Sequence, residues 1–339
     1  MTGQWAYHAQ DKSECWIEWV APNRLAIAKA FAAEKIEADV RITGVLVGGS
    51  TARRDGAEHS DVDVRLVVAG PGADQIAGKD CSVWREGLLV DAGYDPAAKY
   101  TSAQDILTDP YVAGFVRDAL ILYDKDGTLA GVQETVAGEF MQPKWLRARL
   151  ERLAEPIERN GRGFESAISE GRHAEACRAA AFALWTACDA LLVKEGVSPS
   201  WVRGLQKVGQ VLPAERERVI EVEGTEELTP REAEAFLPLF RQAVGENPGM
   251  VMAHAHIGVL WMIRNGLHRE GLHSLWASFG LGLRRLLTSA DQSDHDRAES
   301  LARDWLCQLA WTGSELELRR QRLSAYVRHI LTLIGSAWQ

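Results

Sequence analysis

The sequence predicts an α/β (α+β) fold, with a mixed-sheet domain over residues 1–130 followed by an all-α domain over residues 131–339. Three observations lead to this prediction. Short β-branched runs alternate with turn residues in the first part of the chain. Apolar residues recur at helical spacing in the second part. The length of 339 residues is more than one hydrophobic core usually supports, so two domains are expected.

The first domain is expected to begin with a helix and to continue with strands. Leu25, Ala28 and Phe31 stand at helical spacing within residues 24–35. The expected strands are short apolar runs that are bounded by turn residues. These runs are residues 40–47, 62–68, 87–95 and 119–123.

The second domain is expected to consist of helices alone. Thr229-Pro230-Arg231-Glu232 forms a capping box with proline at the first helical position, so a helix is expected to begin there and to end near residue 245. Gly161, Gly163 and Gly171 are expected to separate the first two helices. The other expected helices are residues 144–159, 172–195, 293–311 and 315–334.

The overall composition is that of a soluble globular protein. Apolar residues make up 46% of the chain and charged residues 25%. The net charge of −9 argues against a general nucleic-acid-binding surface. The five cysteines lack CxxC spacing, which favours free thiols in a reducing compartment. Since the sequence contains neither a signal-peptide pattern nor an apolar run long enough for a membrane span, we expect a cytoplasmic protein without membrane contact.

Two carboxylates of the second expected strand predict a metal site. Side chains alternate along a strand, so Asp61, Asp63 and Arg65 share one face while Val62 and Val64 fill the other. Carboxylates that are two residues apart on one face repel each other. A divalent cation between them removes the repulsion, and Mg²⁺ prefers such oxygen ligands.

Asp91 is the expected third carboxylate. It stands between apolar residues in the middle of the third expected strand, where aspartate is depleted and a buried charge needs a partner. Asp95 has the same parity, but it precedes Pro96, where the strand is expected to end. The third metal ligand is therefore assigned to Asp91.

The loop after the first expected strand favours phosphate binding. Gly48 and Gly49 allow the backbone to approach a ligand closely, and Ser50 offers a hydroxyl. A helix that begins near Thr51 would direct its free N–H groups to the same place. The loop is not a P-loop, because Ser50 stands where that motif requires lysine.

These motifs together resemble the polymerase-β-type nucleotidyltransferase superfamily. Gly49-Ser50, ten intervening residues and Asp61-x-Asp63 are followed by an aspartate on a separate strand. The GGSxAR and SDxD patterns at 48–53 and 60–63 are most similar to the bacterial branch with aminoglycoside nucleotidyltransferases and minimal nucleotidyltransferases. The run at 119–127 resembles the "iLyDxdG" pattern of this branch. One departure is Arg54, where members usually carry glycine.

The resemblance implies a two-metal-ion enzyme that moves a nucleoside monophosphate from Mg-NTP to a hydroxyl of a small molecule. Asp61 and Asp63 would hold two Mg²⁺ ions, and Asp91 would hold one of them or accept the proton of the attacking hydroxyl. The residues implied in nucleotide binding are Gly48, Gly49, Ser50, Arg53 and Ser60. Two alternatives stay open: nucleotidylation of a protein partner, as in toxin–antitoxin pairs, and a nucleotide-binding module without catalysis.

The acceptor is expected to contact the helical domain. Asp189 lies inside an apolar helical segment, which is unusual for an acid. Trp201 and Lys207 follow a proline turn and resemble, with Arg178 and Trp185, residues of the second domain of such enzymes. We therefore predict Asp189, Trp201 and Lys207 as acceptor-side residues.

Overall fold

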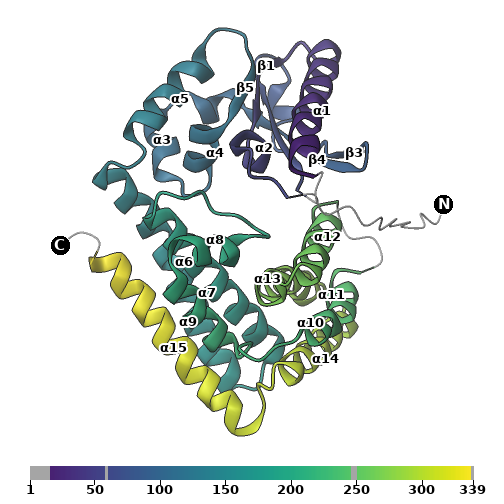
Figure 1. The fold of residues 1–339 in the computed structure, drawn as a ribbon, viewed down its shortest axis with the longest axis vertical. Helices are drawn as coiled ribbons and strands as arrows, with labels where there is room; N and C mark the ends of the chain where they lie inside the picture. Colours follow the sequence, from purple (N-terminus) through teal and green to yellow (C-terminus); the bar gives the residue numbers. More distant parts are fainter. Residues whose placement is uncertain (1–15, 58–59, 246–249, 337–339) are drawn as a thin grey trace. The chain divides into compact units, whose positions relative to one another are not determined.

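The computed structural model describes residues 16–57, 60–245 and 250–336 (Figure 1). The described residues form two compact units. The first unit comprises those within Met1–Pro96 together with Ala119–Lys125, and the second comprises Ala97–Asp118 together with those within Asp126–Gln339. The predicted fold class is confirmed, because the first unit carries a mixed sheet and the second is built from helices.

The sheet has five strands in the order β3-β4-β2-β1-β5. β2 and β4 are parallel, and the other neighbours are antiparallel. The four predicted strands are present, whereas β3 was not predicted, because three residues are too few for a period to show. The strands are β1 (Ile42–Val47), β2 (Val62–Val68), β3 (Val83–Arg85), β4 (Leu88–Pro96) and β5 (Leu120–Asp124).

One face of the sheet is covered by α1 (Trp16–Ala38). Ile27 and Phe31 of this helix are buried in one core with Val62, Val64 and Leu66 of β2. Because strand side chains alternate, this packing turns Asp63 and Arg65 to the opposite face. Two short helices complete the described part of the unit: α2 (Gly49–Arg53) and η1 (Ala73–Gln75).

The helical unit is organised around α7 (His173–Lys194). This helix contacts α6, α8, α13, α14 and α15, and its many alanines let its neighbours approach closely. The shorter elements of the unit are η2 (Ala97–Tyr100), α3 (Ala103–Thr108), α4 (Val112–Asp118), α5 (Thr128–Glu139), α8 (Gly204–Val211), α9 (Pro213–Glu223), α10 (Pro230–Ala235) and α11 (Leu237–Val244). The longer ones are α6 (Pro143–Ser169), α12 (Met250–Arg264), α13 (His268–Leu287), α14 (Gln292–Gln308) and α15 (Gly313–Ser336).

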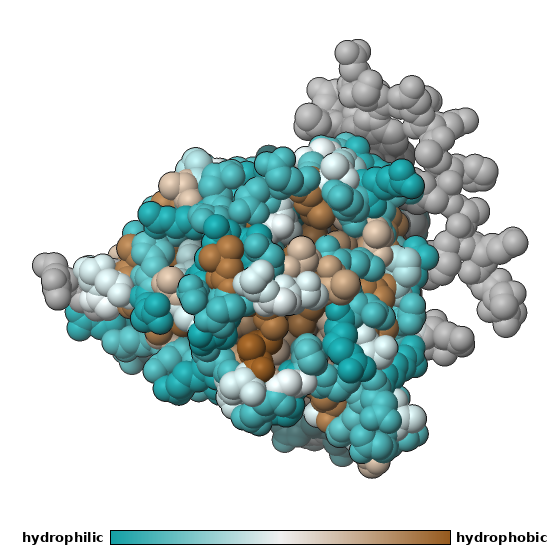
Figure 2. All heavy atoms as spheres, turned by 90° about the horizontal axis from the view of Figure 1, so that it is seen from below, coloured by the Kyte–Doolittle hydropathy of each residue, from teal (hydrophilic) through white to brown (hydrophobic). Residues whose placement is uncertain are grey.

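By length and composition alone, α7 is apolar enough to cross a membrane. However, 83% of its most apolar window is buried by the rest of the described chain, as in a core helix of a soluble protein. Figure 2 shows one face of the molecule, on which hydrophilic residues predominate and hydrophobic residues gather in small groups near the middle. We therefore describe α7 as the core helix of this unit.

Two helix boundaries differ from the predictions. α6 continues through Gly161 and Gly163 and ends at Ser169. Of the three glycines, only Gly171 lies between α6 and α7. Gly161 lies where a Cβ atom would come within 3.1 Å of Val327 Cγ1, so this glycine serves helix packing and does not end a helix. The helix predicted from Thr229 to about residue 245 is divided into α10 and α11, because Pro238 lacks the amide that would continue α10.

An ion pair lies in the core of the helical unit. His273 Nδ1 is 2.6 Å from Glu223 Oε1, and both side chains are almost completely buried. Burial alone would lower the pKa of His273, but the carboxylate of Glu223 and the nearby Cys188 raise it well above its ordinary value. The contact with Glu223 therefore favours the protonated imidazole and a buried ion pair.

We predict that Glu223→Gln lowers the free energy of unfolding by about 3 kcal/mol at pH 6, because the substitution leaves an uncompensated buried imidazolium. Urea unfolding measures this change. The folded pKa of His273 is raised, so the contribution of the pair is complete below the unfolded pKa of about 6.5 and is lost as the pH rises through the folded value. The exposed Glu217→Gln is the control, and an equal loss in both variants would contradict the assignment.

Candidate functional site

Three carboxylates meet on the face of the sheet opposite α1. Asp61 directly precedes β2, Asp63 lies in β2, and Asp91 lies opposite Asp63 in the parallel neighbour β4. Each offers an oxygen atom, and these oxygens lie within 4.8 Å of one another. The structure therefore brings the three predicted metal ligands together, whereas Asp95 is not part of the cluster.

The Gly-Gly pair fixes the loop against the aspartates. The N–H of Gly48 donates a hydrogen bond to the backbone oxygen of Asp63 at 2.9 Å. Gly49 has a φ of 59°, and a Cβ atom there would lie 1.7 Å from Asp63 Oδ2. Only glycine tolerates both this backbone conformation and this close approach. The start of α2 is thereby held directly beside the Asp63 carboxylate.

The carboxylates hold each other in an unfavourable electrostatic state. Burial, together with the charges of Asp61 and Asp91, raises the pKa of Asp63 from 3.8 to about 7. Burial and the charge of Asp91 raise the pKa of Asp61 to about 6. A divalent cation offsets this repulsion, and an all-carboxylate donor set suits a hard ion such as Mg²⁺. The residues present therefore fit a metal site.

Two side chains that were not predicted as site residues lie beside Asp91. The Arg65 guanidinium donates a hydrogen bond to the Val64 carbonyl at 3.0 Å and lies 3.5 Å from the backbone oxygen of Asp91. The Ser82 hydroxyl lies 3.2 Å from Asp91 Oδ1 and accepts a hydrogen bond from the N–H of Ala92 at 2.9 Å. Arg65 adds a positive charge to the cluster, and the Ser82 hydroxyl lies between Asp91 and Asp80, whose Oδ1 accepts its hydrogen bond at 2.5 Å.

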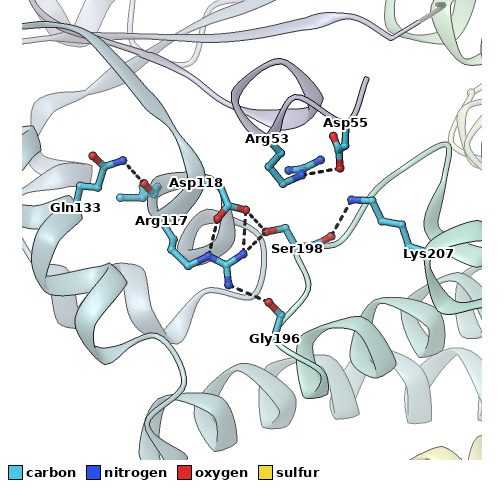
Figure 3. Close-up of polar contacts among 9 residues, drawn as sticks. Arg53, Asp55, Arg117, Asp118, Gln133, Gly196, Ser198 and Lys207 are labelled. Carbon is cyan, nitrogen blue, oxygen red and sulfur yellow. Dashed lines mark hydrogen bonds and ion pairs between the residues drawn. The ribbon is translucent and has the colours of Figure 1, made fainter. Parts of the chain in front are cut away.

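The predicted nucleotide-binding residues occupy different environments. The Ser50 hydroxyl is buried and has no hydrogen-bond partner among the described residues, so it is available to a ligand after a small movement. Ser60 is also buried, but its hydroxyl accepts a hydrogen bond from the N–H of Ala57 at 2.9 Å and thus shapes the loop. Arg53 forms an ion pair with Asp55 at 3.1 Å (Figure 3).

Arg24 of α1 contacts the loop that follows α2, and this contact was not predicted. Its side chain is buried, and its guanidinium donates a hydrogen bond to the carbonyl of Ala57. A Cβ atom at Gly56 would lie 2.0 Å from Arg24 Nη1 and 3.2 Å from Ser50 Oγ, so Arg24 and Ser50 converge at this glycine. Helical spacing could have indicated that Arg24 is buried, because it lies on the same helix face as Ile27 and Phe31.

The three predicted acceptor-side residues lie in the helical unit. Asp189 is fully buried and accepts a hydrogen bond from the Tyr111 hydroxyl at 3.0 Å. Burial raises the pKa of Asp189 to about 7, although Tyr111, His273 and Lys207 act in the opposite direction. The structure thus brings Asp189 and Lys207 within electrostatic reach of each other. Their contact with an acceptor stays a prediction.

Trp201 and Lys207 are engaged by neighbouring groups of the same unit. Lys207 is buried, and its Nζ donates a hydrogen bond to the carbonyl of Ser198 at 3.3 Å. Trp201 Nε1 donates a hydrogen bond to Ser278 Oγ at 3.2 Å, and its ring lies 4.4 Å from that of Trp185. These contacts fix the segment after the proline turn.

An ionic network holds the same segment on α4. The Arg117 guanidinium contacts the Asp118 carboxylate at 2.6 Å and donates a hydrogen bond to the carbonyl of Gly196 at 2.9 Å (Figure 3). The Ser198 hydroxyl donates a hydrogen bond to Asp118 Oδ2 at 2.9 Å. A Cβ atom at Gly114 would lie 2.5 Å from Ser198 Oγ, so this glycine lets the segment approach α4.

Comparisons with known proteins give one distant structural likeness and no sequence match. No protein-family model matches the chain, and no curated protein matches it. Among solved structures, the chain is similar to the crystal structure of a nucleotidyltransferase-like protein from Exiguobacterium sibiricum 255-15. The two chains are 10% identical, the match covers 91% of each, and the TM-score is 0.35. A likeness at this level does not bear on function, so the assignment depends on the geometry of the site.

The metal-free protein is predicted to lose stability as the pH rises from about 4 to about 7. Since the folded pKa of Asp63 is raised from 3.8 to about 7, the folded protein binds more protons than the unfolded chain in this range. Asp63→Asn removes the buried charge and should raise the free energy of unfolding at pH 8 by about 2 kcal/mol in EDTA. Urea unfolding across pH measures both effects. The exposed Asp74→Asn serves as control. If the free energy of unfolding of Asp63→Asn fell with pH as steeply as that of the wild type, the electrostatic account would be wrong.

Arg54 provides a prediction on backbone strain. It ends α2 with a φ of 59°, a left-handed conformation that favours glycine, the residue that the resembling family usually carries here. Arg54→Gly should therefore raise the free energy of unfolding by about 1 kcal/mol. Arg54→Ala removes the same side chain but keeps the backbone strain, so its free energy of unfolding should equal that of the wild type. Equal stability of the two variants would refute the prediction.

Proposed function

We propose that the protein is a metal-dependent nucleotidyltransferase that transfers a nucleoside monophosphate from an NTP to a hydroxyl group, with release of pyrophosphate. One observation carries the proposal: Asp61, Asp63 and Asp91 converge on one sheet face, directly beside the Gly48-Gly49-Ser50 loop. A phosphate-binding loop and a carboxylate cluster in contact are what in-line displacement at phosphorus requires.

In this proposal the three aspartates hold two Mg²⁺ ions, which would neutralise phosphate charge and lower the pKa of the attacking hydroxyl. Asp61 and Asp63 would hold both ions, and Asp91 would hold the ion that lowers the pKa of the attacking hydroxyl. The acceptor oxygen forms a bond to the α-phosphorus while the bond from that phosphorus to the pyrophosphate oxygen breaks. The hydroxyl proton passes to the Asp91 carboxylate.

The loop residues are proposed to bind the NTP. Gly48 and Gly49 let the backbone approach the β- and γ-phosphates. The Ser50 hydroxyl, which has no partner among the described residues, donates to a phosphate oxygen. Arg53 is partly exposed and can exchange its exposed partner Asp55 for a phosphate. Ser60 acts indirectly, because its hydroxyl is used to shape the loop.

The proposed acceptor is a small molecule with a hydroxyl group, in the cytoplasm, with Asp189, Trp201 and Lys207 as the acceptor-side residues. A protein hydroxyl is the second candidate, and a nucleotide-binding module without turnover is the third. The repulsion among the three partly buried carboxylates favours catalysis over the third candidate, because two-metal transfer at phosphorus uses all three.

The experiment that tests this proposal is pyrophosphate release with each NTP, in the presence of Mg²⁺ or Mn²⁺ and a panel of acceptors. Asp61→Asn and Asp63→Asn should lower turnover by about 1000-fold, because each removes a ligand that both ions share. Both variants should stay folded. Asp95→Asn is the matched control on β4 and should keep wild-type turnover.

Thermal unfolding separates the candidates when turnover is absent. Mg-NTP should raise the Tm of the wild type, and EDTA should reverse the shift. A metal-dependent shift without turnover on any acceptor would favour the nucleotide-binding module. No shift with any NTP, or full activity in Asp63→Asn, would disprove the metal assignment.

A further inference from the structure

The helical unit carries two arginines that lack an anionic partner. Arg178 of α7 is partly buried, and Arg284 of α13 is exposed. Among the described residues, neither side chain has a hydrogen bond or an ion pair. The α13 backbone packs closely on α7 here, because a Cβ atom at Gly280 would lie 3.7 Å from Arg178 Cα. Arg284 follows one turn after Gly280, so the two guanidinium groups lie in one region.

The charges of this region repel one another. Burial lowers the pKa of Arg178, and the positive charges of Arg284 and Arg159 lower it further. Of these residues only Arg159 has an acid beside it, Glu155 at 2.6 Å. A cluster of cations with too few anions costs free energy in the absence of a ligand. An anion between Arg178 and Arg284 would offset this cost.

An aromatic strip continues from the arginines along α7. Phe182 and Trp185 follow Arg178 at helical spacing and are partly exposed, although most of α7 is buried. The rings of Phe182 and Trp185 are 6.1 Å apart, and those of Trp185 and Trp201 are 4.4 Å apart. Because Trp201 is also held by Ser278, the strip is rigid before any ligand binds.

We propose that Arg178, Phe182, Trp185, Trp201 and Arg284, here named the α7 strip, bind a phosphomonoester that carries an aromatic ring. Guanidinium groups bind phosphate oxygens in a bidentate manner, and the adjacent aromatic surface packs against a planar ring. The Trp185 Nε1 atom is buried without a partner among the described residues and adds a donor beside the strip. The inference concerns the helical unit alone and does not depend on the proposed transferase activity.

Isothermal titration calorimetry on the full chain in EDTA tests the proposal. The probes are phenyl phosphate, inorganic phosphate and phenol, which separate the anion from the ring. Phenyl phosphate should bind about tenfold more tightly than inorganic phosphate, and phenol should not bind measurably. Arg178→Gln and Arg284→Gln should each weaken phenyl phosphate binding by about tenfold or more. The exposed Arg162→Gln on α6 is the matched control and should bind as the wild type does.

Several outcomes would overturn the proposal. If phenyl phosphate gives no heat of binding, the α7 strip is not a phosphate site. The same follows if phenyl phosphate binds equally well to Arg284→Gln and to the wild type. Arg284 is exposed, so this variant stays informative even if Arg178→Gln does not fold. Equal affinity for phenyl phosphate and inorganic phosphate excludes the ring subsite. If Asp63→Asn lost phenyl phosphate binding, the ligand would bind at the carboxylate cluster and not at the α7 strip. Unchanged binding in Asp63→Asn supports a separate site.

Discussion

The close approach of Gly49 to Asp63 is the contact on which the candidate site depends. Since a Cβ atom at position 49 would lie 1.7 Å from Asp63 Oδ2, the chain can turn into α2 at this point only with glycine. The same contact sets the distance between the Gly48-Gly49-Ser50 loop and the carboxylates. Asp63 in turn lies opposite Asp91 in the parallel pair of β2 and β4, so the loop held at Gly49 lies beside both carboxylates. The repulsion among the aspartates is the cost of this arrangement, and Arg65 offsets part of it.

The sequence was informative where chemistry follows from spacing along one strand or one loop. Asp61 and Asp63 were predicted from alternation, and Asp91 from its unfavourable place among apolar residues. Arg24 and Ser82 were not assigned, because their roles come from contacts across the chain: Arg24 reaches Ala57 from α1, and Ser82 reaches Asp91 from outside β3. A single sequence contains the residues of such contacts but not the pairing that brings them together.

Glycines that serve helix packing explain part of the helical structure that sequence periodicity did not predict. No bounds were predicted for α12 and α13, although together they supply much of the core of the helical unit. Gly282 of α13 lies where a Cβ atom would come within 2.9 Å of Ala243 Cβ, so a residue with low helix propensity is required for packing. Gly161 of α6 has the same role against Val327. Helix propensity and close packing oppose each other at these positions, and packing prevails, which is why a local pattern does not reveal these helices.

The environment of Asp189 constrains any acceptor that uses it. Its carboxylate is fully buried, and one oxygen accepts the Tyr111 hydroxyl while Oδ1 has no partner among the described residues. An amine that contacted this carboxylate would have to enter the buried site or displace Tyr111, which costs a buried hydrogen bond of about 1 kcal/mol in addition to desolvation of the amine. Because burial also raises the pKa of Asp189 to about 7, much of its charge is absent near neutral pH. A polycationic acceptor therefore gains less from Asp189 than its sequence position suggests, and a neutral hydroxyl that donates to Oδ1 fits the buried carboxyl better.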